Sequence, residues 1–151
     1  MLFKRVKLFL TLLLLSAVLL FSCTKSNQSA FELLKNLNGT WKSTGNIIVY
    51  DSWLTLNDST LSGKRFSKIG GDTVFINNFE IKIRKNIITL IIKETKYSVK
   101  KAGLREIYFE NDNNIYPEKI IMSYPGDSTY KYRQENSRGN KVIEFKMKKE
   151  G

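Results

Sequence analysis

The sequence predicts an all-β fold, a closed or nearly closed antiparallel up-and-down β-barrel with one short N-terminal helix and a signal-peptide helix before it. Three observations lead to this prediction. The 151 residues are 42% hydrophobic and include only two prolines and nine glycines, which excludes a disordered chain and a linker. From Thr40 onward apolar residues recur with a period of two, and turn-forming residues separate these runs. A meander of about nine or ten strands has to close or fold over, because open sheet edges promote aggregation. A two-sheet sandwich is the second choice.

The first 22 residues have the pattern of a lipoprotein signal peptide. Lys4, Arg5 and Lys7 form a positive head, and residues 8–21 (LFLTLLLLSAVLLF) form a 14-residue apolar run without a charge. About 20 apolar residues are needed to cross a hydrocarbon core of ~30 Å, so this run is short for a permanent transmembrane helix. Its length and positive flank are typical of a signal peptide.

The end of that run, Leu20-Phe21-Ser22-Cys23, resembles the bacterial lipobox, in which an aliphatic residue lies three places before a cysteine and a small residue directly before it. The resemblance implies that Cys23 is diacylated on sulfur, that cleavage follows Ser22, and that the new amino group is acylated. Each buried methylene contributes about 0.8 kcal/mol, so two or three long chains hold a protein on a membrane permanently. The alternatives are an uncleaved signal anchor and an ordinary secretory peptide in which Cys23 is incidental.

Processing at this position divides the chain into a signal peptide (1–22), an acylated cysteine with its tether (23–29) and one barrel domain (30–151). Cleavage removes three positive charges, so the net charge of +11 falls to +8. No Asp follows Cys23 directly and no acidic cluster follows it, and these are the inner-membrane and cell-surface sorting signals of some Gram-negative bacteria. By that resemblance we expect a cell-envelope protein, lipid-anchored at the periplasmic face of the outer membrane through acylated Cys23. Such an exported chain is not expected to bind nucleic acid.

A short helix is predicted at the start of the barrel domain. Residues 29–32, Ser-Ala-Phe-Glu, form a capping-box pattern. It predicts a helix from Ala30 to about Leu37 that ends at Asn38-Gly39, with Phe31, Leu34 and Leu37 on one side.

The remaining elements are predicted strands. Residues 79–84, 97–100 and 143–148 alternate apolar and charged side chains, as half-buried strands do. Residues 87–92 (IITLII) are apolar on both faces, which predicts a strand covered on both sides, for example by the helix. Turn-forming residues lie between the runs, at 57–58, 70–72, 85–86, 102–103, 111–114, 125–127 and 138–140.

Several segments between residues 31 and 148 match a family pattern, and the segment from Phe109 to Ile120 is the most specific of them. Leu37-Asn38-Gly39-Thr40-Trp41 has the form Leu-x-Gly-x-Trp, and residues 108–111 (Tyr-Phe-Glu-Asn) are followed by Tyr-Pro-Glu-Lys-Ile at 116–120. Together with weaker matches at 50–53, 61–63 and 71–83, they resemble a bacterial family of uncharacterised lipocalin-like domains. The resemblance implies a lipocalin-like β-barrel and carries no established activity. In lipocalins the equivalent of Trp41 packs beneath a basic residue of the last strand, and Lys146 or Lys148 is the expected counterpart.

The composition argues against catalysis. Histidine is absent and there is one cysteine, so no Ser-His-Asp triad, no imidazole metal ligand and no intramolecular disulfide can form. The glutamates at 80, 94, 106, 110 and 144 lie on predicted strands beside Lys and Arg, where solvated surface is the first interpretation. No acidic spacing resembles a calcium loop. We therefore expect no catalytic residue, no metal site, no cofactor and no enzyme.

Ligand binding remains a hypothesis at this stage. A barrel of about eight strands encloses room for packed side chains or for one small ligand. For a small hydrophobic or amphipathic ligand, the candidate binding residues are Trp53, Tyr97, Phe109, Glu110, Asn111 and Tyr130. The alternative is a side-chain-filled barrel without a ligand, a structural or interaction lipoprotein whose protein partner no motif identifies.

Overall fold

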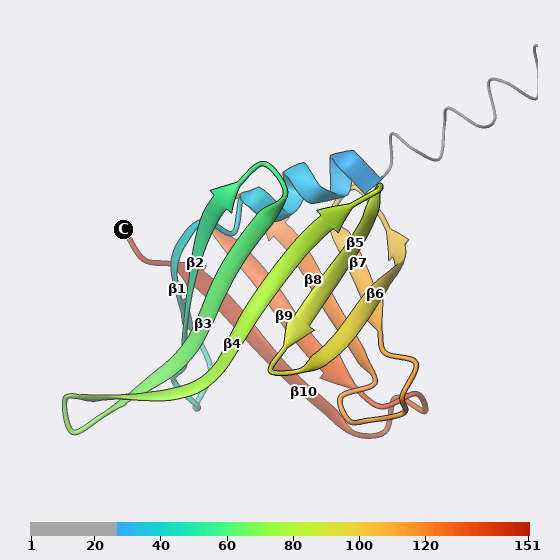
Figure 1. Cartoon of the computed structure of the whole chain (residues 1–151). Helices are drawn as coiled ribbons and strands as arrows, with labels where there is room; N and C mark the ends of the chain where they lie inside the picture. Colours follow the sequence, from blue (N-terminus) through green and yellow to red (C-terminus); the bar gives the residue numbers. More distant parts are fainter. Residues whose placement is uncertain (1–26) are drawn as a thin grey trace, which may run out of the picture.

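Ten strands form one closed antiparallel barrel, which confirms the predicted fold class. In this computed structural model the described residues are 27–151, so the predicted signal peptide (1–22) and Cys23 lie outside them. Each strand pairs with its neighbour in sequence, and β1 closes the ring against β10 (Figure 1). The strands are β1 (Gly39–Ser43), β2 (Tyr50–Asn57), β3 (Thr60–Ile69), β4 (Asp72–Arg84), β5 (Ile87–Ile92), β6 (Thr95–Ala102), β7 (Glu106–Glu110), β8 (Lys119–Gly126), β9 (Thr129–Glu135) and β10 (Val142–Lys149).

One helix covers one end of the barrel (Figure 1). Residues 27–35 are helical, and Phe31, Leu34 and Leu37 are completely buried against the strands. The predicted capping box is wrong, because Ser29 lies inside the helix and not at its first residue. Burial of the apolar side, more than local capping, decides where such a short helix lies. Among residues 27–151 no helix is both long and apolar enough to cross a membrane.

The prediction that β5 is covered on both faces is wrong. Ile88 and Leu90 point into the barrel and are buried, whereas Ile87 on the outer face is 59% exposed. The helix packs on the end of the barrel and leaves this outer face uncovered (Figure 1). A strand of a single closed sheet has one outer face, so its apolar residues there meet water or a partner.

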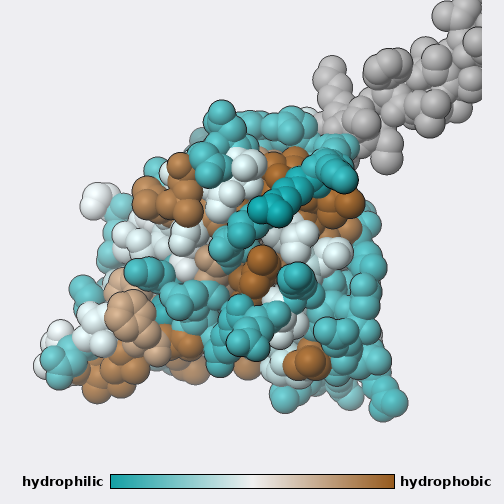
Figure 2. All heavy atoms as spheres, viewed as in Figure 1, coloured by the Kyte–Doolittle hydropathy of each residue, from teal (hydrophilic) through white to brown (hydrophobic). Residues whose placement is uncertain are grey.

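A two-stranded ribbon of β3 and β4 extends beyond the barrel at the end opposite the helix (Figure 1). β3 and β4 pair over their full length, from Thr60↔Lys82 to Ile69↔Asp72, whereas β5 pairs with β4 only from Phe79 to Arg84. The free part of the ribbon carries exposed apolar side chains, which Figure 2 shows gathered at its tip: Ile69, Val74, Phe75 and Ile76.

Candidate functional site

The interior of the barrel is filled by side chains from every strand. Alternation along each strand turns one set of residues inward, and this set forms a single buried cluster with the helix residues. Its largest fully buried members are Trp41, Tyr97, Tyr130, Phe31, Phe109, Leu34, Leu37, Leu61, Ile81, Ile88, Leu90 and Ile107. A polar centre lies among them.

That centre is an ion pair between Asp51 on β2 and Arg65 on β3. The two residues are direct cross-strand partners, and their exposed fractions are 0% and 3%. Arg65 Nε donates to Asp51 Oδ1 at 2.7 Å, and Nη2 donates to Oδ2 at 2.7 Å. The hydroxyl of Tyr130 on β9 also donates to Oδ2. The buried carboxylate is thus held by three charge-assisted hydrogen bonds.

Aromatic rings enclose the guanidinium on its other sides. The Arg65 Cζ lies 4.2 Å from the ring centroid of Tyr132, 4.6 Å from that of Phe145 and 5.3 Å from that of Phe79. Rings at these distances attract a cation through their negative faces, and the attraction strengthens when water is excluded. The cage therefore replaces part of the hydration that Arg65 loses on burial.

Arg65 and the two tyrosines of this centre each keep one protonation state near neutral pH. Burial opposes the charge of Arg65, but the hydrogen bond and charge of Asp51 outweigh this effect and raise the pKa of Arg65. Burial, followed by the charge of Asp51, raises the pKa of Tyr130 well above 10, while Arg65 opposes this rise. Burial also raises the pKa of Tyr132. Near pH 7 the guanidinium therefore stays charged and both phenols stay neutral, so they remain hydrogen-bond donors.

Four of the six predicted ligand-binding residues lie inside the barrel. Trp53, Tyr97, Phe109 and Tyr130 are buried and point inward. Trp53 stacks on Phe79, with centroids 5.4 Å apart and planes 13° from parallel. The Nε1 of Trp53 makes no hydrogen bond of normal geometry within residues 27–151. Its N–H nevertheless lies near the hydroxyl of Tyr130 and partly opposes the rise in the pKa of Tyr130.

The other two predicted residues differ in their positions. Glu110 alternates with inward Phe109 and is half-buried on the outer side, with Oε1 3.9 Å from the Nζ of Lys119. Asn111 is buried and organises the loop between β7 and β8, since its Nδ2 donates to the carbonyl oxygens of Ile115 and Pro117 at 2.8 Å each. Its side chain also lies close enough to the Tyr97 hydroxyl to oppose the rise that burial causes in the pKa of that phenol. The peptide bond between Tyr116 and Pro117 in this loop is cis.

Trp41 closes the helix-covered end. Its Nε1 donates to the carbonyl oxygen of Leu37 at 2.5 Å, and its ring meets Tyr130 edge-on at 5.0 Å. The basic residue over its ring is Lys149, with Nζ 5.3 Å from the centroid, so the expectation of Lys146 or Lys148 is wrong. The register pairs Trp41 with Lys149. Lys149 lies on the same side of β10 as the buried Met147, whereas Lys146 and Lys148 lie on the outer side.

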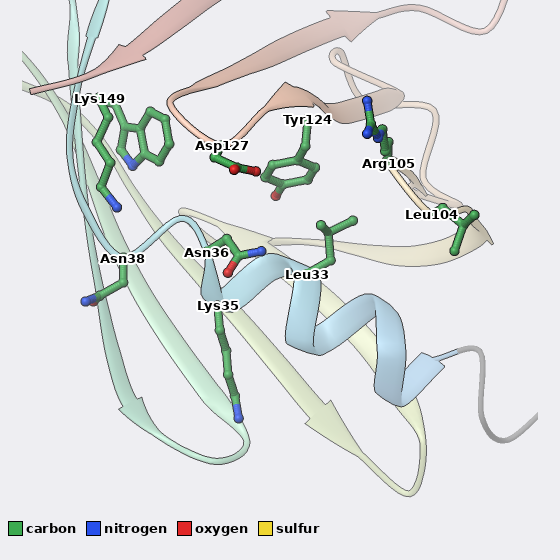
Figure 3. Close-up of a pocket in the computed structure, with 10 residues that line it drawn as sticks. Leu33, Lys35, Asn36, Asn38, Leu104, Arg105, Tyr124, Asp127 and Lys149 are labelled. Atoms are coloured by element: carbon green, nitrogen blue, oxygen red, sulfur yellow. The ribbon is translucent and has the colours of Figure 1, made fainter.

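A groove of about 440 Å³ lies between the helix and this end of the barrel (Figure 3). Tyr124 points from β8 toward helix residues Leu33 and Asn36 (Figure 3). Its hydroxyl is buried and has no hydrogen-bond partner within residues 27–151, and burial raises its pKa. The complete lining is Leu33, Lys35, Asn36, Asn38, Trp41, Leu104, Arg105, Tyr124, Asp127 and Lys149.

Sequence reasoning missed Asp51, Arg65 and Tyr124. Val49, Asp51 and Trp53 alternate toward the interior at the start of β2. The available signal was therefore a charged residue at a position where the alternation predicts an apolar one. Nothing in the sequence identifies its partner, because the pairing depends on the register of β2 against β3.

The comparisons add no further assignment. Neither a scan against protein-family models nor a search of curated proteins finds a match for this chain. Within the described part of the chain, no group of three or more Cys, Asp or Glu residues could hold a metal ion.

Proposed function

We propose that this chain is a lipid-anchored lipoprotein of the cell envelope, held at the periplasmic face of the outer membrane by acylated Cys23. Its lipocalin-like barrel is filled by its own side chains and acts through its surface, as an interaction module. The observation that carries this proposal is the Asp51–Arg65 pair, completely enclosed at the centre of the barrel.

A ligand inside the barrel would have to displace this centre. Arg65 is held by Asp51 on one side and by the rings of Tyr132 and Phe145 on others. Separating a buried ion pair costs about 3–5 kcal/mol when one charge is left without its partner. The interior is therefore better suited to rigidity than to carrying a ligand.

Native mass spectrometry of the protein purified from membranes tests the filled interior. The expected species is the acylated chain without a bound small molecule. Its mass should not increase when envelope lipids or a small apolar probe such as benzene are added. Phe109→Ala, which removes a fully buried ring, is the matched control, because an apolar cavity of that size binds such probes. A stoichiometric lipid on the unmodified protein, lost in Trp53→Ala or Tyr97→Ala, would contradict the proposal.

The exposed ribbon tip is the surface to test for a protein partner. Contiguous exposed apolar side chains on a soluble domain are typical of interaction sites, and the tip has four of them. A photo-cross-linking amino acid in place of Phe75 should give one defined adduct in living cells. The same amino acid in place of Lys148 on β10, four strands from β4 around the ring, should give none. Identical adducts from both positions, or none from either, would argue against a partner at the ribbon.

A second candidate function is binding of a small anionic amphiphile in the groove under the helix. The specific observation is the buried hydroxyl of Tyr124, which has no hydrogen-bond partner within residues 27–151. It lies in a groove with Arg105, Lys149, Asp127 and Lys35, the last of which pairs with Glu32, so the lining carries more positive than negative charge. A dodecyl phosphate titration should raise the melting temperature, and Arg105→Gln should weaken the effect. An equal response in both proteins would exclude the groove as the binding site.

A further inference from the structure

The outer surface of β4, β5 and β6 combines an apolar strand with basic flanks. Ile87, Thr89 and Ile91 point outward along β5. The register places Arg84 opposite Ile87, Lys82 opposite Thr89, and Lys96 opposite Ile91. These residues and Lys85 line a shallow, open depression of about 750 Å³, here named the basic face.

The basic face carries an excess of positive charge that the protein does not neutralise. Lys82 pairs with Glu80. Arg84, Lys85 and Lys96 have no ion pair within residues 27–151. Figure 2 shows hydrophilic side chains in a diagonal row across this side of the molecule, with hydrophobic ones next to them. An anionic surface with an apolar layer beneath it is complementary to such a face.

The chain enters the barrel next to this face. The Nδ2 of Asn27 donates to the carbonyl oxygen of Asn86 at 2.8 Å, and Asn86 belongs to the turn between β4 and β5. The start of the helix lies beside that turn (Figure 1). Cys23 precedes Asn27 by four residues, and four residues span at most about 14 Å. An acyl anchor on Cys23 therefore keeps Arg84, Lys85 and Ile87 near the membrane surface.

We propose that the basic face rests on the membrane, with its cations on the phosphates of anionic phospholipids and Ile87 at the headgroup boundary. This inference rests on the proposed acylation of Cys23. It gives the barrel one orientation, in which β5 faces the bilayer and β10, half-way around the ring, faces away from it. The apolar outer side of β5, which no part of the described chain covers, then has a partner.

Fluorescence quenching in reconstituted vesicles tests this orientation. The acylated protein is purified from membranes and placed in vesicles of phosphatidylethanolamine and phosphatidylglycerol that contain a spin-labelled lipid. Thr89→Cys carries a fluorophore on the basic face, and Lys148→Cys carries it on β10. Acylation consumes the only natural cysteine thiol, so each label is unique. We expect quenching at position 89 to exceed that at position 148 at least threefold, and equal quenching would overturn the inference.

Charge variants identify the cause of the orientation. The triple variant K82Q/R84Q/K85Q should abolish the excess quenching at position 89, and 1 M salt should reduce it, because exposed charges are then screened. The control triple K42Q/K131Q/K146Q removes the same charge from the outer side of β1, β9 and β10, leaves position 148 free for its label, and should leave quenching unchanged. Equal effects of both triples would show only a net-charge effect and would overturn the inference.

The two proposals fail in different ways. A protein that does not associate with vesicles and carries a free Cys23 thiol contradicts the acylation and with it the orientation. A vesicle-bound protein without excess quenching at position 89 contradicts the orientation alone. Persistent excess quenching in vesicles of purely zwitterionic lipid would contradict the anionic partner. An in-cell cross-link from position 89 to an acidic protein, with no quenching in vesicles, would contradict the membrane contact and identify that protein as the partner of the basic face.

Discussion

At the scale of single residues, the buried ion pair is the feature with the largest expected energetic consequence. Asp51→Asn leaves the charge of Arg65 buried without its counter-charge, and Arg65→Met leaves Asp51 likewise, so each variant should lose about 3–5 kcal/mol of unfolding free energy. The double variant should lose clearly less than the sum of the two, because it leaves no orphaned charge. Urea unfolding of all four proteins measures this coupling, and additivity within about 0.5 kcal/mol would contradict it.

Two buried tyrosines differ in their hydroxyl partners and form a matched pair. Tyr130 donates to Asp51, so Tyr130→Phe should cost about 1.5–3 kcal/mol, the contribution of a hydrogen bond to a charged group. Tyr124 has a buried hydroxyl with no partner within residues 27–151, so Tyr124→Phe should be neutral or slightly stabilising. Thermal unfolding measures both, and an equal loss in the two variants would contradict the assigned roles.

The same tyrosines predict a loss of stability at alkaline pH. Burial raises the pKa of Tyr124, Tyr130 and Tyr132 above 10. The folded protein then holds protons that the unfolded chain releases. Their contribution is complete below pH 10 and is lost as the pH rises above it, by about 1.4 kcal/mol per pH unit for each tyrosine.

Absorbance at 295 nm, recorded together with circular dichroism, tests this pH dependence. The chain has seven tyrosines. Four of them are buried, namely Tyr97, Tyr124, Tyr130 and Tyr132, and burial raises the pKa of each, so these four should ionise only as the barrel unfolds. Ionisation of all seven near pH 10 in an intact barrel would contradict their burial.

At the scale of elements, the contact between β2 and β3 depends on one glycine. Gly63 is the cross-strand partner of Trp53, and a Cβ at residue 63 would lie 2.6 Å from the Cε3 of that indole. Gly63→Ala should therefore cost about 1–3 kcal/mol through overpacking. Gly45→Ala, where an added Cβ meets nothing within 4 Å, is the control and should change stability by less than about 0.5 kcal/mol. Equal stabilities in urea would contradict the close contact.

The sequence predicts most elements because the alternation of the strands is local. Residues 79–84, 97–100 and 143–148 all lie in strands β4, β6 and β10. The helix is also predicted, but not its inclusion of residues 27–29. Asn27 donates to the carbonyl oxygen of Asn86 in the β4–β5 turn, a long-range contact that the capping-box pattern does not indicate. Whether another element covers the outer face of β5 could not be predicted, because apolar residues on both sides of a strand do not indicate what they contact.

At the scale of the whole molecule, ring closure is predictable and the polar centre is not. Ten consecutive strands with one apolar face imply a closed sheet. The Asp51–Arg65 pair, the ring cage around Arg65 and the position of Lys149 over Trp41 all depend on long-range register, which a single sequence does not specify. Of the six predicted ligand residues, Glu110 lies on the outer side of β7, as its alternation with inward Phe109 implies. The contacts of Asn111 with its own loop and with Tyr97 depend on the loop conformation, which the sequence pattern does not specify.

The proposed orientation of the whole molecule depends on the proposed acylation of Cys23. An anchor four residues before Asn27 would place the β4–β5 turn near the bilayer, while the apolar tip of the β3–β4 ribbon lies at the end of the barrel opposite the helix (Figure 1). The proposed lipid contact and the proposed partner contact therefore use different parts of the surface.

The intact mass of the protein isolated from membranes tests this account most directly. The predicted mass is that of the chain from Cys23 to Gly151 plus a diacylglyceryl group and an amide-linked fatty acid, with no further small molecule retained under native conditions. A mass that shows the full 151 residues, or a chain with an unmodified thiol at position 23, would contradict the account.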